Sequence, residues 1–291
     1  MKVAVTGSNG FIGKALVKEL IQQGNEVCVL LRTAATGNSK AIIYTKSLHE
    51  CAEELQQWQP DVFFHLAWRG VDSQQRNNEE NNQYNYQLTI DSVQLAKQAG
   101  CKQWIGTGSQ AEYGVLNKKI TEEEICTPVT AYGITKQRLY TETKQLCNSY
   151  QMIHTWARIF SVYGPGDHPE TFIAYLISNM LQQKTIEVSS GTQQWDYLFI
   201  DDAVAALSSL INLEGVYNIA SGETVVLKEV AETIAGLTNY KELIQWGKKQ
   251  DAPLRYLCGS IQKIKNETDW TPKISLKEGL TKTIAHHHLT V

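Results

Sequence analysis

The sequence has few of the features that would place the chain outside the ordinary globular proteins. Its 291 residues include six cysteines, and no two of them form a CxxC pair. We therefore expect neither a disulfide framework nor a cysteine-bound metal, and we predict reduced thiols, as in a cytoplasmic protein. The net charge is only −3, which gives no electrostatic basis for binding nucleic acid or an anionic membrane.

Long apolar runs are also missing. No stretch of about 18 apolar residues occurs, so no transmembrane helix is expected. The chain starts with Met1 and Lys2 and enters a β-branched segment at once, without the pattern of a secretory signal peptide. Three consecutive histidines at 286–288 could suggest a metal site, but adjacent residues on a helix point in different directions. We therefore predict no metal site.

The first strong pattern is a strand, a glycine-rich loop and a helix. Residues 2–6 form a short apolar run, TGSNGFIG follows at 6–13, and an amphipathic stretch ends at Gly24. The glycines at 7, 10 and 13 would permit a tight turn, the approach of a pyrophosphate to the backbone, and close packing of helix and strand. The helix N-terminus would then face the pyrophosphate. A purely structural turn is the alternative, and the second strand that follows at 26–31 counts against it.

The end of that second strand predicts which nicotinamide cofactor is bound. Enzymes that use NAD usually place an acidic residue there to bind the ribose 2′-hydroxyl, whereas an arginine accommodates the 2′-phosphate of NADP. Here the strand runs into Arg32 and Thr33, with no acidic residue. We therefore expect NADP(H) to be favoured over NAD(H), unless Arg32 is merely a solvated loop residue.

Strands and helices alternate through the next part of the chain. The last residues of the fourth expected strand, Leu66 and Ala67, should lie beside the cofactor at the carboxyl end of the sheet. This alternation predicts an α/β fold with a Rossmann-type doubly wound parallel sheet. The expected segments are strands at 41–44, 61–67 and 103–107 and helices at 48–58 and 82–99.

Tyr132 and Lys136 lie four residues apart and would share one side of a helix. An ammonium beside a phenol favours the phenolate, so Lys136 should lower the pKa of Tyr132 from about 10 toward the working pH. Such a tyrosine can pass a proton to or from a sugar or alcohol oxygen while a cofactor moves a hydride. Taken alone the pair is weak, because a half-buried tyrosine with a solvated lysine gives the same spacing.

Several segments together resemble the extended short-chain dehydrogenase/reductases, the NAD(P)-dependent epimerase/dehydratase family, over essentially the whole chain. They are TGSNGFIG (6–13), DVFFHLA (61–67), GSQAEYG (108–114), YGITK (132–136), RIFSVYGPGD (158–167), WDYLFIDD (195–202), GVYNIASGETVVLKEVAETI (215–234) and DWTPKISLKEGLTKTI (269–284). The resemblance implies a Rossmann-type sheet with a smaller C-terminal α/β substrate lobe. An NADP-binding domain would span 1–166, with 192–220 returning to it, and 167–191 and 221–291 would form the nucleotide-sugar-binding lobe.

The same resemblance implies roles for individual residues. Ser109, four residues before Tyr113, would hydrogen-bond the reacting substrate oxygen, Tyr132 would be the general acid/base, and Lys136 would also bind the nicotinamide ribose. Asn85 matches the asparagine at the start of the family's long helix, which helps to hold the cofactor. The implied cofactor contacts are Gly7, Asn9, Gly10, Phe11, Ile12, Gly13, Arg32, Leu66, Ala67, Asn85, Thr107, Tyr132 and Lys136, and the implied substrate contacts are Trp68, Ser109, Gln110, Tyr132, Ser161, Trp195 and Arg255.

The residues after Ser109 narrow the reaction among 4,6-dehydration, epimerisation and keto reduction. Family dehydratases carry an Asp-Glu pair directly after the Ser/Thr, because eliminating water needs an additional acid and base. Gln110 and Ala111 stand there and cannot do this, and Glu112, one place further, is expected to be solvated or structural. Ala111 also occupies the neighbourhood of the cysteine found in C3/C5 epimerases. A 4-ketoreductase and an NAD-dependent 4-epimerase remain, and Arg32 favours the reductase.

Two tryptophans, Trp68 and Trp195, resemble those of reductases acting on nucleotide-linked 4-keto-6-deoxyhexoses. The family commonly has an arginine at the position of Trp195 to hold the substrate phosphates, and tryptophan cannot form such a bidentate pair. Arg255 and Arg158 are candidates to replace it, whereas Trp195 would stack on a base or sugar or pack in the core. The expected product is a nucleotide 6-deoxyhexose for surface polysaccharide. Two long helices, at 82–99 and 129–150, resemble those that form family homodimers.

The C-terminal part is expected to be a small mixed lobe. The substrate cleft should lie between this lobe and the carboxyl edge of the sheet. Asp201 is expected to be the N-cap of one of its neighbouring helices. The expected segments are helices at 170–183, 201–213, 227–237 and 276–288 and short strands at 186–188 and 216–219.

Overall fold

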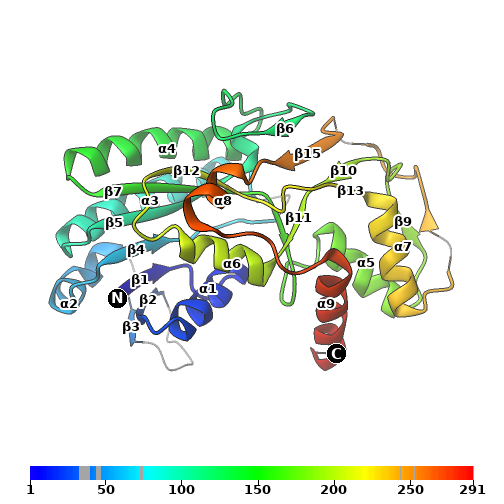
Figure 1. The fold of residues 1–291 in the computed structure, drawn as a ribbon, viewed down its shortest axis with the longest axis horizontal. Coiled ribbons are helices and arrows are strands. Elements are labelled where there is room, and N and C mark those ends of the chain that lie inside the picture. The colour runs from blue at the N-terminus through cyan, green and yellow to red at the C-terminus, as the bar shows by residue number, and fades with distance from the viewer. Residues whose placement is uncertain (33–39, 44–46, 73–74, 243, 252, 291) are drawn as a thin grey trace. The chain divides into compact units, whose positions relative to one another are not determined.

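A computed structural model describes residues 1–32, 40–43, 47–72, 75–242, 244–251 and 253–290 of the chain (Figure 1). The chain packs as two compact units. Unit 1 consists of Met1–Gly114, Ile125–Ile159 and Val204–Tyr217, and unit 2 consists of Val115–Glu124, Phe160–Ala203 and Asn218–Val291.

Unit 1 is organised around a seven-stranded sheet. Its strand order is β12-β7-β5-β4-β1-β2-β3, and the six strands from β7 to β3 are parallel. The chain steps outward from β1 to β2 and β3, then returns to step the other way through β4, β5 and β7, which is the doubly wound, Rossmann-type order. The strands are β1 (Lys2–Thr6), β2 (Glu26–Leu31), β3 (Lys40–Ile43), β4 (Val62–His65), β5 (Gln103–Ser109), β7 (Ile153–Ile159) and β12 (Gly215–Ile219).

Helices cover both faces of this sheet. Figure 1 shows α1 on one side and α3 and α4 on the other. Under α3 and α4, the strand residues Phe63 and Trp104 belong to one buried apolar cluster with the helix residues Leu88 and Leu139. Strands buried on both faces read as nearly continuous apolar runs, which is why they were visible in the sequence. The helical segments are α1 (Phe11–Gln22), η1 (Leu48–Cys51), α2 (Ala52–Trp58), α3 (Glu79–Gln98), η2 (Gln110–Glu112) and α4 (Ala131–Ser149). Helix α6 (Ile200–Ser209) belongs to unit 1 from Val204 onward.

Unit 2 combines small sheets with short helices. One sheet has the strand order β13-β10-β15-β6, and the pairs β11-β8 and β14-β9 form two smaller ones. The helices α5 and α7 pack against each other. Its elements are β6 (Lys119–Ile120), β8 (Ser161–Tyr163), α5 (Phe172–Leu181), β9 (Ile186–Glu187), β10 (Gln194–Trp195), β11 (Tyr197–Phe199), β13 (Val225–Val226), α7 (Leu227–Thr238), β14 (Ile244–Gln245), β15 (Tyr256–Gly259), α8 (Gln262–Thr268) and α9 (Leu276–Thr290).

The observed elements differ from the expected ones mainly at their ends. The long helix α3 begins at Glu79, not at residue 82, because the Asn78 side chain accepts a hydrogen bond from the backbone N–H of Asn81 and caps it. The expected helix at 48–58 is divided into the 3-10 turn η1 and α2. Tyr44, the expected end of the third strand, lies outside the described residues.

The expectation for Asp201 was wrong. Helix α6 begins at Ile200, so Asp201 lies in its first turn, where a negative charge still favours the helix N-terminus. Its neighbour Asp202 is buried and accepts hydrogen bonds from the backbone N–H groups of Lys273 and Ile274.

Residues 192–203, which we expected in the NADP-binding domain, belong to unit 2 because β10 pairs with β13 and β15 and β11 pairs with β8.

None of the helices among the described residues combines the length and the apolar character that crossing a membrane requires.

Candidate active site

The glycine-rich loop after β1 brings backbone very close to backbone. Gly7 has φ +74°, and a Cβ there would lie 2.5 Å from the backbone nitrogen of Ala67. A Cβ on Gly13 would lie 2.1 Å from the carbonyl oxygen of Gly7. Both positions therefore require glycine, and the loop stays narrow enough for α1 to start directly over the end of β1.

The same loop has the features of a pyrophosphate cradle. Gly10 is the N-cap residue of α1. Because it has no side chain, the first N–H groups of the helix have no side-chain cap. The hydroxyl of Ser8 is buried and has no hydrogen-bond partner among the described residues. Asn9 is exposed, while Phe11 and Ile12 are half-buried at the start of the helix. This geometry fits a dinucleotide whose diphosphate rests on the N-terminus of α1.

Arg32 lies directly after β2 and is exposed. Because β1 and β2 are parallel neighbours, β2 ends at the same edge of the sheet as the glycine-rich loop. The segment 33–39 that follows lies outside the described residues. The structure therefore puts Arg32 at the expected edge, and its contact with a ribose phosphate stays a prediction.

The end of β4 is held by a buried polar network. His65 lies between the hydroxyls of Thr6, at 2.9 Å from Nδ1, and Thr89, at 3.1 Å from Nε2. Burial lowers the pKa of His65 to about 3, so the imidazole is neutral. Asn85, which is 1% exposed, accepts from the backbone N–H of Arg69 and donates to its carbonyl. These contacts fix the segment that carries Leu66, Ala67 and Trp68.

Ser109 ends β5 and begins the short turn η2. It is 9% exposed, and its hydroxyl accepts from the backbone N–H of Ala111 at 3.2 Å. Its own backbone N–H donates to Glu112 Oε1 at 2.7 Å, which completes a capping box. The orientation of the Ser109 side chain is thus set by local hydrogen bonds.

Glu112 is fully buried, so the expectation of a solvated side chain was wrong and the structural alternative holds. Its Oε2 pairs with Arg158 Nε at 2.8 Å, and both its oxygens accept from Trp156 Nε1. Arg158 is 3% exposed and is therefore committed to this pair. Its candidacy as a phosphate-binding residue is wrong for this reason, because releasing Arg158 would leave the buried carboxylate of Glu112 without a partner.

Tyr132 and Lys136 lie on the first two turns of α4, as expected. The helix starts after Thr130, whose hydroxyl accepts from the backbone N–H of Gly133. A Cβ on Gly133 would lie 2.5 Å from the carbonyl oxygen of Ala111. Glycine next to Tyr132 therefore lets α4 approach the turn after Ser109 closely.

Lys136 is buried against the sheet, and its Nζ lies closer to the Trp68 ring than to the Tyr132 ring. Its Nζ donates to the carbonyl of Thr107 at 2.7 Å and lies 3.6 Å from the centroid of a Trp68 ring, but 5.9 Å from the centroid of the Tyr132 ring. Burial lowers the pKa of Lys136 to about 7. The cation is thus shared with an aromatic face and a backbone carbonyl.

The pKa of Tyr132 does not move in the expected direction in this arrangement. Burial raises the pKa of the phenol above its ordinary value. A hydrogen bond with the Ser109 side chain and the charge of Arg76 oppose this, while the Glu112 carboxylate adds to it. Lys136, whose Nζ donates to the Thr107 carbonyl and lies over the Trp68 ring, does not offset the effect of burial on the phenol.

Unit 1 therefore brings together most of the expected catalytic and cofactor residues. The ring of Trp68 meets that of Tyr132 edge to face, with centroids 5.4 Å apart. Gln110 is half-buried in the turn after Ser109. One residue that the sequence did not single out is Arg76, whose guanidinium lies 5.8 Å from the centroid of the Tyr132 ring. Its only signal was a place in a polar loop.

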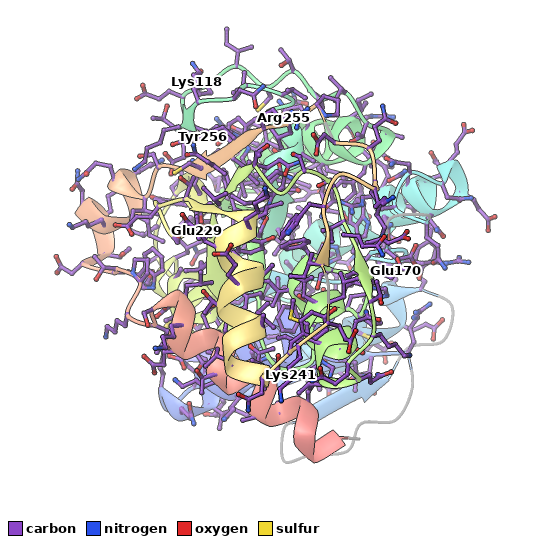
Figure 2. All side chains as sticks on the ribbon, turned by 90° about the vertical axis from the view of Figure 1, so that its right-hand side faces the viewer. Lys118, Glu170, Glu229, Lys241, Arg255 and Tyr256 are labelled. Carbon is purple, nitrogen blue, oxygen red and sulfur yellow. The ribbon has the colours of Figure 1, made fainter. Side chains whose placement is uncertain are left out.

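The remaining expected substrate residues lie in unit 2. Trp195 Nε1 donates to the hydroxyl of Ser161 at 2.7 Å, so these two residues of β10 and β8 meet. Arg255 pairs with Asp251 at 2.7 Å and remains half exposed. Figure 2 shows Arg255 and Tyr256 near Lys118, and the side chain of Asn117 accepts from the backbone N–H groups of both.

Comparison with known proteins gives the family and the fold. A family model described as "NAD dependent epimerase/dehydratase family" matches residues 3–220. The chain is 25% identical over 312 residues to a Bacillus subtilis (strain 168) protein described as the uncharacterized UDP-glucose epimerase YtcB, and the match covers 98% of each. It is 23% identical over 303 residues to the dTDP-4-dehydro-6-deoxyglucose reductase of Escherichia coli, covering 97% of the chain and 96% of that protein.

Solved structures agree with these relatives. UDP-glucose 4-epimerase from Thermotoga maritima, crystallised with UDP-glucose, superposes with a TM-score of 0.87 at 25% identity, covering 100% of this chain and 99% of that one. RMD from Pseudomonas aeruginosa, complexed with NADPH, gives a TM-score of 0.85 at 24% identity with the same coverage. The second similarity concerns the fold alone.

Proposed function

The chain belongs to the NAD dependent epimerase/dehydratase family, and on this premise we propose that it is an NADPH-dependent reductase of a nucleotide-linked 4-keto-6-deoxyhexose. More broadly, it is a nucleotide-sugar-modifying enzyme of the extended short-chain dehydrogenase/reductase family with a nicotinamide cofactor. The proposed product is a nucleotide 6-deoxyhexose for surface polysaccharide. We also propose a cytoplasmic homodimer that associates through α3 and α4.

The surroundings of Ser109 support reduction over dehydration. Elimination of water needs an acid and a base besides the tyrosine, and the residues next to Ser109 are Gln110 and Ala111. The nearby carboxylate, Glu112, is fully buried and bound to Arg158 and Trp156. A carboxylate held in this way serves the structure of the turn and is not available for proton transfer.

The residue that follows β2, Arg32, supports the use of NADPH as a soluble reductant. This is the observation that carries the proposal. An epimerase returns the same hydride and retains its cofactor, whereas a reductase consumes a reduced cofactor in each turnover. Arg32 stands where NAD enzymes place an acid. A guanidinium there favours the 2′-phosphate of NADPH, since phosphate is a ligand that arginine binds with paired hydrogen bonds.

The chain's own residues then account for the proton. The nicotinamide cofactor supplies the hydride when bound. Tyr132 donates its phenolic proton to the C4 oxygen of the sugar, and the Ser109 hydroxyl hydrogen-bonds the same oxygen and orients it. Lys136 would bind the ribose and stabilise the phenolate once its contacts with Thr107 and Trp68 rearrange.

Substrate recognition would use residues of both kinds, aromatic and basic. We propose that Trp68 contacts the sugar beside Tyr132, as their edge-to-face contact suggests. Trp195, held by Ser161, would stack on the sugar or base. Arg255 has a half-exposed guanidinium and is the remaining candidate to bind the substrate phosphates.

The alternative is an NAD-dependent nucleotide-sugar 4-epimerase. It is favoured by the match with UDP-glucose epimerases over nearly the full length of the chain. It would use the same Ser109, Tyr132 and Lys136, with the cofactor retained in the protein. In that case Arg32 would be a bystander.

One experiment separates the two. Purified protein is offered NADPH with a panel of UDP-, dTDP-, CDP- and GDP-4-keto-6-deoxyhexoses, and loss of the reduced-nicotinamide absorbance is followed in the wild type and in Tyr132→Phe. We expect oxidation with one nucleotide and its loss, by about 100-fold or more, in the variant. Absence of oxidation, together with interconversion of ordinary nucleotide sugars and NAD bound to the purified protein, would replace the reductase by the epimerase.

A further inference from the structure

A second cation lies beside Tyr132. Arg76 belongs to the loop between β4 and α3, and its guanidinium carbon is 5.8 Å from the centroid of the Tyr132 ring. Its side chain is half-buried and forms no ion pair with the carboxylates of the described residues. An arginine remains charged at any working pH. Its charge is thus directed to the phenol and not to an acidic partner.

The position of Arg76 is fixed from the side of α3. Asn82 donates from Nδ2 to the carbonyls of Arg76, at 3.1 Å, and Asn78, at 3.0 Å. Asn81 donates from Nδ2 to the carbonyl of Gln75 at 3.2 Å. Asn81 and Asn82 are both buried. Two buried amides thus bind the backbone of the segment 75–78 and fix its path.

The same segment is also bound to the start of α4. The side chain of Asn77 accepts from the backbone N–H of Tyr132 itself, at 3.2 Å. One of the N–H groups that the helix leaves free at its N-terminus is satisfied in this way. The residue next to Arg76 is therefore tied to the residue that Arg76 faces, so the two side chains keep their relative position.

The other charged groups around the phenol leave a role for this arginine. Lys136, on the same helix, is bound to Thr107 and Trp68, and burial lowers its pKa to about 7. Glu112, from η2, raises the pKa of Tyr132, while Ser109, at the end of β5, and Arg76 lower it. Among the described residues that act on Tyr132, Arg76 is therefore the permanent positive charge.

We propose that Arg76 is a positioning residue that stabilises the phenolate of Tyr132, acting as a second cation beside the ring in addition to Lys136. This rests on the proposed role of Tyr132 as general acid. When the phenol gives its proton to the C4 oxygen, the negative charge left on the tyrosine oxygen is compensated by the guanidinium. Asn77, Asn81 and Asn82 then support this role through the loop that they hold.

The test compares Arg76→Gln with a matched variant, Arg69→Gln. Arg69 lies in the same loop, but its guanidinium lies over the ring of Tyr84, at 5.6 Å. The ionisation of Tyr132 is followed as the difference in phenolate absorbance between each protein and the same protein carrying Tyr132→Phe. We expect Arg76→Gln to raise the midpoint by roughly one pH unit, Arg76→Lys to restore most of the shift, and Arg69→Gln to leave the wild-type curve unchanged.

A parallel pH profile of NADPH oxidation should show the same displacement in kcat. Coinciding titration curves for Arg76→Gln and wild type, including curves that both lack a transition, would overturn the role of Arg76. The absorbance titration needs no substrate, so it remains interpretable if the reductase proposal fails. Full turnover in Tyr132→Phe would instead overturn the role of Tyr132 and leave the titration result standing.

Discussion

At the scale of single residues, Lys136 is the side chain whose burial has the clearest consequence for stability. The folded protein releases its proton near pH 7, because burial lowers the pKa of Lys136 to about 7, whereas the unfolded chain has the ordinary value of 10.5. Between these two pH values the unfolded state holds more protons. The free energy of unfolding must therefore rise with pH in this window, and below it the full penalty of burying the ammonium applies.

Replacing Lys136 by methionine should remove this penalty. We expect Lys136→Met to be more stable than wild type at pH 7 and the difference to shrink toward pH 9. The change over this interval should be roughly 2 kcal/mol, since each pH unit corresponds to about 1.4 kcal/mol and the folded state is already half deprotonated at pH 7. Urea unfolding at both pH values measures it. Lys144→Met, on an exposed position of the same helix, is the control, and a pH-independent difference for Lys136→Met would contradict the argument.

Some contacts of these residues could be predicted from the sequence and others could not. The spacing of Tyr132 and Lys136 correctly predicted that both lie on one helix. The fate of Glu112 and Arg158 could not be predicted, because their ion pair joins residues 46 positions apart. The same holds for the effect of Lys136 on Tyr132, since the carbonyl of Thr107 competes for the ammonium across 29 positions.

At the scale of secondary-structure elements, the crossing of β1 and α1 depends on one missing Cβ. A methyl group on Gly13 would lie 2.1 Å from the Gly7 carbonyl oxygen, which is backbone and cannot rotate away. We expect Gly13→Ala to displace α1, to destabilise the fold by about 1–3 kcal/mol and to weaken nicotinamide cofactor binding at least tenfold. Isothermal titration with NADPH and urea unfolding measure the two effects.

The matched control lies in another helix. Gly236 of α7 has open space where its Cβ would stand, so Gly236→Ala should stabilise the protein by roughly 0.5–1 kcal/mol through helix propensity alone. Its cofactor affinity should equal that of wild type. Equal affinities for Gly13→Ala and Gly236→Ala would mean that the loop does not bind the cofactor.

Elements with strong periodicity or apolar runs could be predicted, whereas the short strands could not, apart from the one expected at 186–188, which is β9. The strands β1, β2, β4 and β5 and the helices α1 and α3 were recognisable because each presents apolar side chains to the core. The two-residue strands β6, β10, β13 and β14 exist only through pairing with distant partners, such as Trp195 opposite Leu257. Nothing in their local sequence specifies a strand.

At the scale of the whole molecule, the α/β class and the doubly wound strand order could be predicted from the sequence. The alternation of strands and helices leaves few topologies open. The division into units was less accessible. Residues 115–124 and 160–203 join unit 2 although the surrounding sequence belongs to unit 1. The points where the chain passes from one unit to the other could not be predicted, because no linker of distinct amino-acid composition separates these segments.

The cofactor preference can be tested on the stability of the whole protein. A ligand that binds only the folded state stabilises it by an amount that grows with the logarithm of its concentration over its dissociation constant. If Arg32 binds the 2′-phosphate, NADPH at a given saturating concentration should raise the melting temperature more than NADH does. A tenfold difference in affinity corresponds to about 1.4 kcal/mol and, for a chain of this size, to roughly 2–4 °C.

Removing the guanidinium should abolish this difference while leaving the cofactor bound. We expect Arg32→Ala to show nearly equal melting temperatures with NADPH and NADH, because the contacts to the diphosphate and the nicotinamide half are common to both. Lys18→Ala, which removes one exposed positive charge from α1, should keep the wild-type preference. Equal protection by both cofactors in the wild type would remove the support that Arg32 gives to a reductase, and stronger protection by NADH would favour the epimerase.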